Sequence, residues 1–171
     1  INDLGSYKCS LNQLTQNDDD GDGVINQLDD YPSDPEISNT TYTPSELGWG
    51  TLAYEDLWPS KGDYDFNDLV VNYRFLLVEN AQNEIVRIKA KFQVKAIGAS
   101  YHNGFGFKMD LNPSLIKSVS GYNLTENIVS LNNKGLENGH SNGSTIIVFD
   151  DAYDNIGSKT GGFVNTDPSM P

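Results

Sequence analysis

Residues 86–96 alternate strictly between apolar and polar side chains. A period of two is typical of a β-strand with one buried and one solvated face. Residues 68–78 place Val71, Tyr73, Phe75 and Leu77 on one face, and the turn-forming residues 79–83 between the two stretches predict an antiparallel hairpin. The other expected strands are 105–111 and 145–149, with shorter candidates at 115–119, 128–131 and 162–164.

Short strands separated by turns rich in Gly, Asn, Ser and Pro, without a helical period of useful length, are typical of all-β proteins. We therefore predict an antiparallel β-sandwich of jelly-roll type, preceded by a helix-free loop.

The 171 residues suffice for one domain with an appendage. We expect residues 1–16, which include the single Cys9, to be a linker or the end of a preceding module. An acidic loop (17–36) and a connector (37–50), with one helical turn at 45–47, are expected to lead into the sandwich, 51–171. A start at Ile and a turn-rich end predict a piece of a longer protein, truncated on the C-terminal side of the sandwich.

The formal net charge of −13 argues against partners that are held through phosphates, because nucleic acids and anionic lipids require basic patches. Eight acidic residues lie in residues 17–36 and five in residues 55–68. This clustering favours cations as partners. No apolar run approaches the roughly 18–20 residues that span a bilayer.

The first acidic segment has the spacing of a twelve-residue calcium loop, with carboxylates at positions one, three, five and twelve and Gly23 at position six. Alternate residues of such a loop point inward, and its flexible oxygen geometry suits Ca²⁺ better than Mg²⁺. The alternative is a solvated acidic linker. The predicted ligands are Asp18, Asp20, Asp22, the Val24 carbonyl, Asn26 and Asp29.

The segment after this loop differs from an EF-hand, because residues 30–35 contain two prolines in place of an amphipathic helix. Residues 18–35 resemble a thrombospondin type 3 repeat, which is a helix-free calcium loop. The resemblance implies that Asp34 reaches back to the same ion or a neighbouring one.

The second acidic segment repeats the one-three-five spacing with Asp63, Asp65 and Asn67, but Asp68 at position six excludes a standard loop. We expect its oxygens to lie at a sheet end, where Glu55 and Asp56 join them around a cation that offsets their mutual repulsion. The alternative is a turn with acidic caps. The predicted ligands are Glu55, Asp56, Asp63, Asp65, Asn67 and Asp68.

Residues 51 to about 166 resemble the LruC domain of secreted and lipid-anchored bacterial surface proteins. The resemblance implies calcium binding, surface adhesion and further β segments beyond the last match. The matching stretches are Tyr54–Pro59, Gly62–Val71, Ala96–Ala99, Gly104–Phe107, Val148–Ala152 and Phe163–Thr166.

Catalysis has little support in the sequence. His102 and His140 stand in turn-like settings without a recognisable nucleophile motif. Asp150 and Asp151 are candidates either for a further metal ligand or for a turn cap. Trp58 is expected in the core rather than stacked on a sugar. The basic stripe that alternates along residues 87–95 is expected to be a solvated strand face.

These features predict a calcium-binding, non-enzymatic module at the outer surface of a bacterium or outside the cell, which serves adhesion or binds a glycan or peptide. The alternatives are a structural stalk and a carboxylate-dependent glycoside hydrolase. A second site covered by Trp58 and Tyr64 favours a structural ion, whereas an open site favours a ligand.

Overall fold

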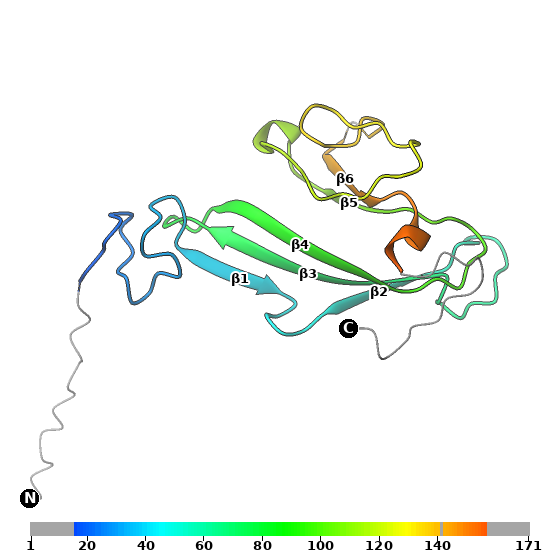
Figure 1. Cartoon of the computed structure of the whole chain (residues 1–171), viewed down its shortest axis with the longest axis horizontal. Helices are drawn as coiled ribbons and strands as arrows, with labels where there is room; N and C mark the ends of the chain where they lie inside the picture. Colours follow the sequence, from blue (N-terminus) through cyan, green and yellow to red (C-terminus); the bar gives the residue numbers. More distant parts are fainter. Residues whose placement is uncertain (1–15, 141, 157–171) are drawn as a thin grey trace, which may run out of the picture. The chain divides into compact units, whose positions relative to one another are not determined.

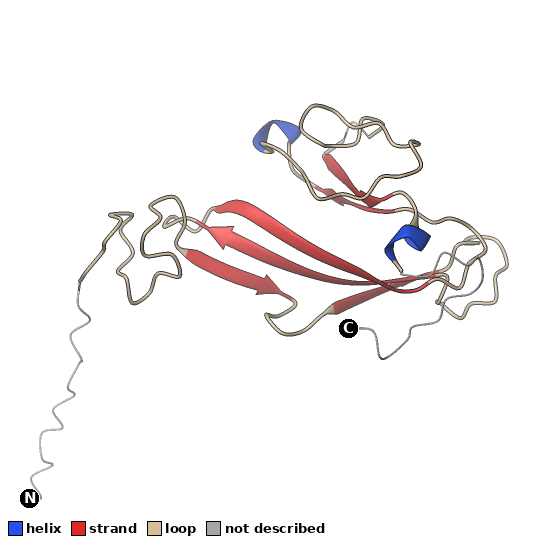
Figure 2. Ribbon diagram, viewed as in Figure 1, coloured by secondary structure: helices blue, strands red, loops and turns tan. Residues whose placement is uncertain are grey.

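The computed structural model describes residues 16–140 and 142–156. In these ranges the helical segments are two short 3₁₀ turns, and the rest is strand and loop (Figure 2). The protein is all-β with antiparallel sheets, as predicted from the sequence. The elements are β1 Asn39–Thr43, β2 Gly50–Tyr54, β3 Leu69–Glu79, β4 Ile85–Ala96, β5 Phe105–Met109, η1 Pro113–Leu115, β6 Ser144–Phe149 and η2 Ala152–Asn155.

The larger sheet has four strands and is organised by β3 (Figure 1). β1 and β2 both pair antiparallel with β3, β1 along its C-terminal part and β2 along its N-terminal part. β4 also pairs with β3. The hairpin between β3 and β4 turns at Asn80–Glu84, where the Asn80 N–H donates to the Glu84 carbonyl at 3.0 Å. The predicted hairpin is therefore confirmed.

The smaller sheet consists of β5 and β6, which pair antiparallel with an irregularity between Phe105 and Gly106. A Cβ atom on Gly106 would lie 2.7 Å from the Ile146 carbonyl oxygen, so glycine permits the close approach of the two strands there.

The chain forms two compact units. One contains the described parts of residues 1–47 and 75–90, and the other those of residues 48–74 and 91–171. We describe each unit by itself.

The main hydrophobic core lies in the unit of residues 48–74 and 91–171. Side chains of both sheets meet there, and Phe105 packs against Phe92 and Phe149 with ring centroids 5.4 and 5.7 Å apart. Burial of these large apolar side chains supplies the main stabilisation of this unit. The buried members of the core are Leu69, Val71, Val94, Ile97, Phe105, Phe149, Ala152 and Ile156.

In the other unit the first acidic loop is attached to β1 by hydrogen bonds. The Asp30 N–H donates to the Ser38 carbonyl at 2.8 Å, and the Thr40 N–H donates to Asp30 Oδ2 at 2.9 Å. Ser38 is fully buried and its N–H donates to the Glu79 carbonyl of β3. The loop is thus tied to the sheet through the start of β1.

Several expectations for individual segments were wrong. The connector 37–50 contains β1, and residues 45–47 form a bend instead of a helical turn. Residues 115–119 form no strand, and 128–131 contribute one isolated bridge, between Leu131 and Glu137. Residues 162–164 lie outside the described residues.

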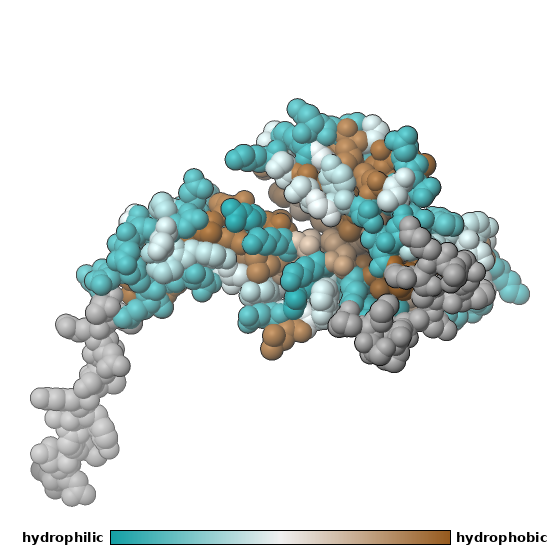
Figure 3. All heavy atoms as spheres, viewed as in Figure 1, coloured by the Kyte–Doolittle hydropathy of each residue, from teal (hydrophilic) through white to brown (hydrophobic). Residues whose placement is uncertain are grey.

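The expected buried face of β4 is confirmed only in its second half. Residues 85–91 are all exposed, whereas Val94 and Ala96 are buried. Figure 3 shows hydrophobic surface over the first half of β4, where the exposed side chains include Val86 and Ile88. The alternation in this half of β4 is therefore not matched by burial.

None of the described helical segments is long and apolar enough to cross a membrane.

Candidate cation sites

The first acidic loop brings Asp18, Asp20 and Asp22 together, with one carboxylate oxygen of each within 4.8 Å of the others. Backbone N–H groups of the loop donate hydrogen bonds to these carboxylates: the Asp22 N–H donates to Asp20 Oδ1 at 3.2 Å and the Val24 N–H donates to Asp22 Oδ1 at 2.7 Å. Gly23 has φ +99°, a left-handed conformation that glycine adopts readily. Gly23 therefore permits the sharp turn at position six of the loop.

Three carboxylate oxygens of this loop are buried without a hydrogen-bond donor: Asp20 Oδ2, Asp22 Oδ2 and Asp29 Oδ2. In Asp29, which is only 9 % exposed, Oδ1 accepts the Tyr31 N–H at 2.6 Å. Burial, followed by the charges of Asp22 and Asp20, raises the pKa of Asp29, although the Tyr31 N–H opposes this. Buried carboxylate oxygens without donors are costly unless a cation compensates them.

The remaining predicted ligands of the first loop lie in different settings. Asn26 Oδ1 accepts the Asp19 N–H at 2.9 Å, and Val24 lies half-buried in the loop. Asp34 is exposed, and its Oδ1 accepts the Glu36 N–H at 3.2 Å. Neither Asp29 nor Asp34 belongs to the group of Asp18, Asp20 and Asp22 whose oxygens lie within 4.8 Å of one another. The charges of Asp22 and Asp20 nevertheless act on Asp29.

The second acidic segment forms a separate cluster of Glu55, Asp63 and Asp65, whose oxygens also lie within 4.8 Å of one another. Glu55 is fixed by the Phe66 N–H, which donates to its Oε1 at 2.6 Å. A Cβ atom on Gly62 would lie 2.8 Å from Glu55 Oε2, so the glycine makes room for this carboxylate. The segment therefore folds around Glu55.

Asp56, Asn67 and Asp68 were predicted to join the same ion. Asp56 and Asp68 lie outside this cluster, whereas the Asn67 side-chain amide donates a hydrogen bond to Asp65 Oδ2. The Asp56 N–H donates to Asp68 Oδ2 at 2.9 Å, and Asp68 is only 8 % exposed. Burial and the neighbouring Asp68 raise the pKa of Asp56. Asn67 faces Gly98, whose N–H donates to the Asn67 carbonyl at 2.9 Å. The predicted six-residue site is thus divided into two parts.

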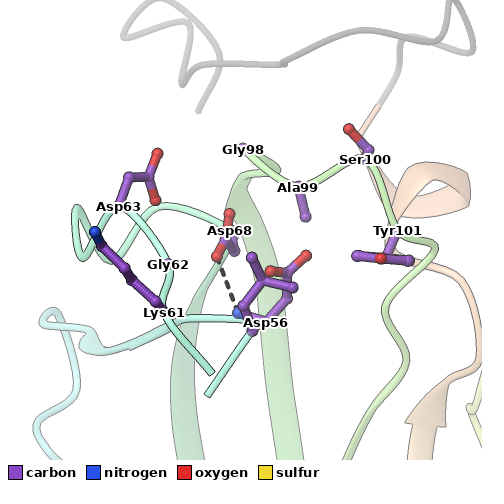
Figure 4. A pocket seen from close by; sticks show the side chains of 10 residues that line it. Asp56, Lys61, Gly62, Asp63, Asp68, Gly98, Ala99, Ser100 and Tyr101 are labelled. Carbon is purple, nitrogen blue, oxygen red and sulfur yellow. Dashed lines mark hydrogen bonds between the residues drawn. The ribbon is translucent and has the colours of Figure 1, made fainter. Parts of the chain in front are cut away.

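A cavity of about 440 Å³ lies beside this segment (Figure 4). Trp58 and Tyr64, whose cover of the site would favour a structural ion, are 74 % and 51 % exposed. The expectation that Trp58 lies in the core was therefore wrong. The cavity is lined by Asp56, Leu57, Lys61, Gly62, Asp63, Asp68, Gly98, Ala99, Ser100 and Tyr101.

A third acidic cluster, Glu126, Asp151 and Asp154, was not anticipated as a group. Its residues are up to 28 positions apart in the sequence, so no local spacing signals it. Asp151 is buried, but both of its oxygens are occupied: Oδ1 accepts the Tyr153 N–H at the start of η2, and Oδ2 lies 2.7 Å from His102 Nδ1. Asp151 thus acts as a cap in this structure.

The neighbouring Asp150 is also a structural carboxylate. Its burial disfavours the charge, but the N–H groups of Thr125 and Glu126 donate to it at 2.8 and 2.9 Å. These donors outweigh burial and lower the pKa of Asp150. Of the two roles that the sequence left open, this geometry favours turn capping.

The two histidines each contact a carboxylate: His102 contacts Asp151, and His140 Nδ1 lies 2.6 Å from Glu137 Oε2. The hydrogen bond and charge of Asp151 raise the pKa of His102. The attraction between protonated His102 and Asp151 is therefore fully present below the ordinary histidine pKa of about 6.5 and is lost as the pH rises through the higher folded value.

We expect the NMR titration midpoint of His102 to lie above about 6.5 and to fall back toward it in Asp151→Asn, because the amide removes the charge and can still accept the Tyr153 N–H. Asp110→Asn, which changes an exposed carboxylate, is the control and should leave the midpoint unchanged. An unaltered His102 midpoint in Asp151→Asn would refute this assignment.

The fold and these clusters define an all-β protein with acidic loops. A family model described as a domain of unknown function, DUF4842, matches residues 83–171, which is just over half of the chain. The chain belongs to this family. The match covers the Gly98–Tyr101 wall of the cavity but neither the first acidic loop nor Glu55, Asp63 and Asp65. No curated protein and no solved structure matches the chain.

Proposed function

We propose that the chain is a calcium-binding module of a bacterial surface protein, in which Ca²⁺ orders the two acidic segments. The observation that carries the proposal is the set of buried, donor-free oxygens of Asp20, Asp22 and Asp29 in the first loop. An ion at their centre would compensate three carboxylates that otherwise repel one another. The twelve-residue spacing and the all-oxygen donor set favour Ca²⁺ over Mg²⁺.

A second calcium is proposed at Glu55, Asp63 and Asp65. The support is their mutual proximity and the way the Phe66 N–H and Gly62 position Glu55. All three residues are partly or fully exposed, and this leaves room for water or an external ligand to complete the coordination. This openness favours a ligand-binding role over an ion that only rigidifies the segment.

The proposed location at the bacterial surface and the proposed adhesive role rest on two resemblances: that of residues 51–166 to the LruC domain and that of residues 18–35 to a thrombospondin type 3 repeat. Calcium outside cells is concentrated enough to fill weak extracellular sites, with Kd of about 10⁻⁴–10⁻³ M. The alternative of a structural stalk draws support from the first loop, whose Asp30 is bonded to the start of β1.

Thermal melts of metal-stripped protein at increasing Ca²⁺ test the proposal. The melting temperature should rise with Ca²⁺, because an ion that binds only the folded state stabilises it by roughly 2.7 kcal/mol at a hundredfold excess over Kd. Asp20→Ala and Asp65→Ala should each remove part of this rise.

Asp34→Ala is the matched control for the first loop, because Asp34 is exposed and lies outside the cluster. It should melt like the wild type at every Ca²⁺ concentration. Equal stabilisation by Mg²⁺ would contradict the choice of metal, and no rise at millimolar Ca²⁺ would contradict the proposal as a whole.

A further inference from the structure

The first half of β4, residues 85–90, is exposed along its whole length. Ile85, Val86 and Ile88 are 52 %, 50 % and 40 % exposed, and Figure 3 shows hydrophobic surface over this part of the strand. Strands of an antiparallel sheet commonly bury one face, because apolar side chains gain free energy when they leave water. We call residues 85–90 the β4 surface, and its exposed apolar side chains make it a candidate contact region.

The β4 surface also lies at an edge of its sheet. Within the described segments, β4 pairs with β3 and with no other strand. Along the other side of an edge strand, a row of backbone N–H and C=O groups is directed away from the sheet and can pair with an added strand. Both the backbone and the side chains of residues 85–90 are therefore open to an extended segment from outside.

The charge of this edge differs from that of the chain as a whole. Residues 85–96 contain four basic residues and no acidic one, whereas the chain has a formal net charge of −13. Arg87 and Lys89, the two basic residues of the β4 surface, are exposed and take part in none of the ion pairs found within residues 16–140 and 142–156. A local row of positive charges favours a partner that carries negative charge.

We propose that the β4 surface binds an extended segment of a partner protein in which apolar and acidic side chains alternate. The segment joins the sheet as a further strand, and its backbone pairs with the outward N–H and C=O groups of residues 85–90. Its apolar side chains cover Val86 and Ile88, and its acidic side chains lie beside Arg87 and Lys89. The inference does not depend on whether the acidic segments hold calcium.

A second copy of the same strand fits this edge poorly. Side chains alternate with a period of two, so pairing β4 with itself along the β4 surface can match apolar side chains only if basic side chains also meet. Arg87 or Lys89 would then lie opposite another basic residue. Like charges directly opposite each other destabilise a sheet, so the pattern favours an acidic partner over self-association.

The test is an NMR titration of the full chain with the acetylated and amidated peptide Val-Glu-Val-Glu-Val-Glu, whose like charges oppose its pairing with itself. We expect saturable shifts of the backbone amides of Val86, Arg87 and Ile88. A peptide of the same composition in two blocks, Val-Val-Val-Glu-Glu-Glu, does not match the alternation. It should bind at least about tenfold more weakly, a difference of about 1.4 kcal/mol.

Reversal of the two charges tests the choice of partner. The double variant Arg87→Glu with Lys89→Glu should weaken the alternating glutamate peptide at least about tenfold and should bind Val-Lys-Val-Lys-Val-Lys in its place. Lys117→Glu, which changes an exposed lysine outside β4, is the control and should leave the affinity unchanged. Melting curves show whether each variant folds. If the double reversal does not fold, Arg87→Gln with Lys89→Gln removes the charges alone and gives the same test.

Equal binding of the two glutamate peptides, or binding that survives the charge reversal, would overturn the proposal. Absence of any shift would also overturn it, and the basic residues would then serve only to keep the edge from pairing. Concentration-dependent shifts of the same amides without peptide would contradict it as well, because a second copy of the chain would then occupy the edge.

Discussion

Asp29→Asn is expected to stabilise the calcium-free protein and to weaken its calcium binding at the first loop at least about tenfold. The substitution affects stability and calcium affinity in opposite directions, because Asp29 Oδ2 is buried without a donor and is repelled by the charges of Asp20 and Asp22. Without a cation the charge is a cost, and asparagine removes it while its carbonyl oxygen still accepts the Tyr31 N–H. When calcium is bound, the Asp29 carboxylate coordinates the ion and its charge becomes favourable.

The measurement is a pair of thermal melts, in chelator and in saturating Ca²⁺, for the wild type, Asp29→Asn and Asp34→Asn. The melting temperature of Asp29→Asn should lie above that of the wild type in chelator and below it in Ca²⁺, while Asp34→Asn should follow the wild type in both. Destabilisation of Asp29→Asn in chelator would show that the carboxylate is satisfied by the protein alone.

Gly98→Ala is expected to destabilise the protein by about 1–3 kcal/mol, the usual cost of forcing an extra carbon into a filled space. A Cβ atom at this position would lie 1.6 Å from Asn67 Oδ1 and 3.0 Å from the Asn67 carbonyl oxygen. The added methyl group must therefore displace the end of the second acidic segment, which also carries Asp65 and Asp68. Urea unfolding measures the loss.

The double variant Gly98→Ala with Asn67→Ala provides the control, because it removes the side-chain clash and keeps the backbone contact. It should recover part of the stability that Gly98→Ala loses, as a positive coupling in a double-mutant cycle. Additive losses in the two single variants would show that Asn67 does not set the requirement for glycine at position 98.

Strands were predictable where apolar side chains recur along one face, although in β4 that face is buried only in its second half. The period of two identified β3, β4 and β5, because Val71, Val94 and Phe105 lie on faces that enter the core. β6 was expected from its apolar run alone. β1 was missed because its sequence, Asn-Thr-Thr-Tyr-Thr, has no apolar alternation. Its β-branched threonines and its pairing with β3 make it a strand, and the pairing is non-local.

The first loop was predictable in detail because its ligands lie within twelve consecutive residues and the local turn geometry alone brings them together. The arrangement of the second segment was not predictable, because it depends on how β2 pairs with β3. Glu55 and Asp56 follow directly after Tyr54, which pairs with Leu69. Asp56 already lies in the turn that follows β2, so no spacing in the sequence indicates which carboxylate joins which cluster.

Calorimetric titration of Ca²⁺ into the metal-stripped wild-type chain tests the central claim most directly, because it counts bound ions. We predict two ions per chain, one at Asp18, Asp20, Asp22 and Asp29 and one at Glu55, Asp63 and Asp65, with Asp20→Ala and Asp65→Ala each reducing the count to one. No saturable heat at millimolar Ca²⁺ would contradict the claim that these acidic segments are calcium sites.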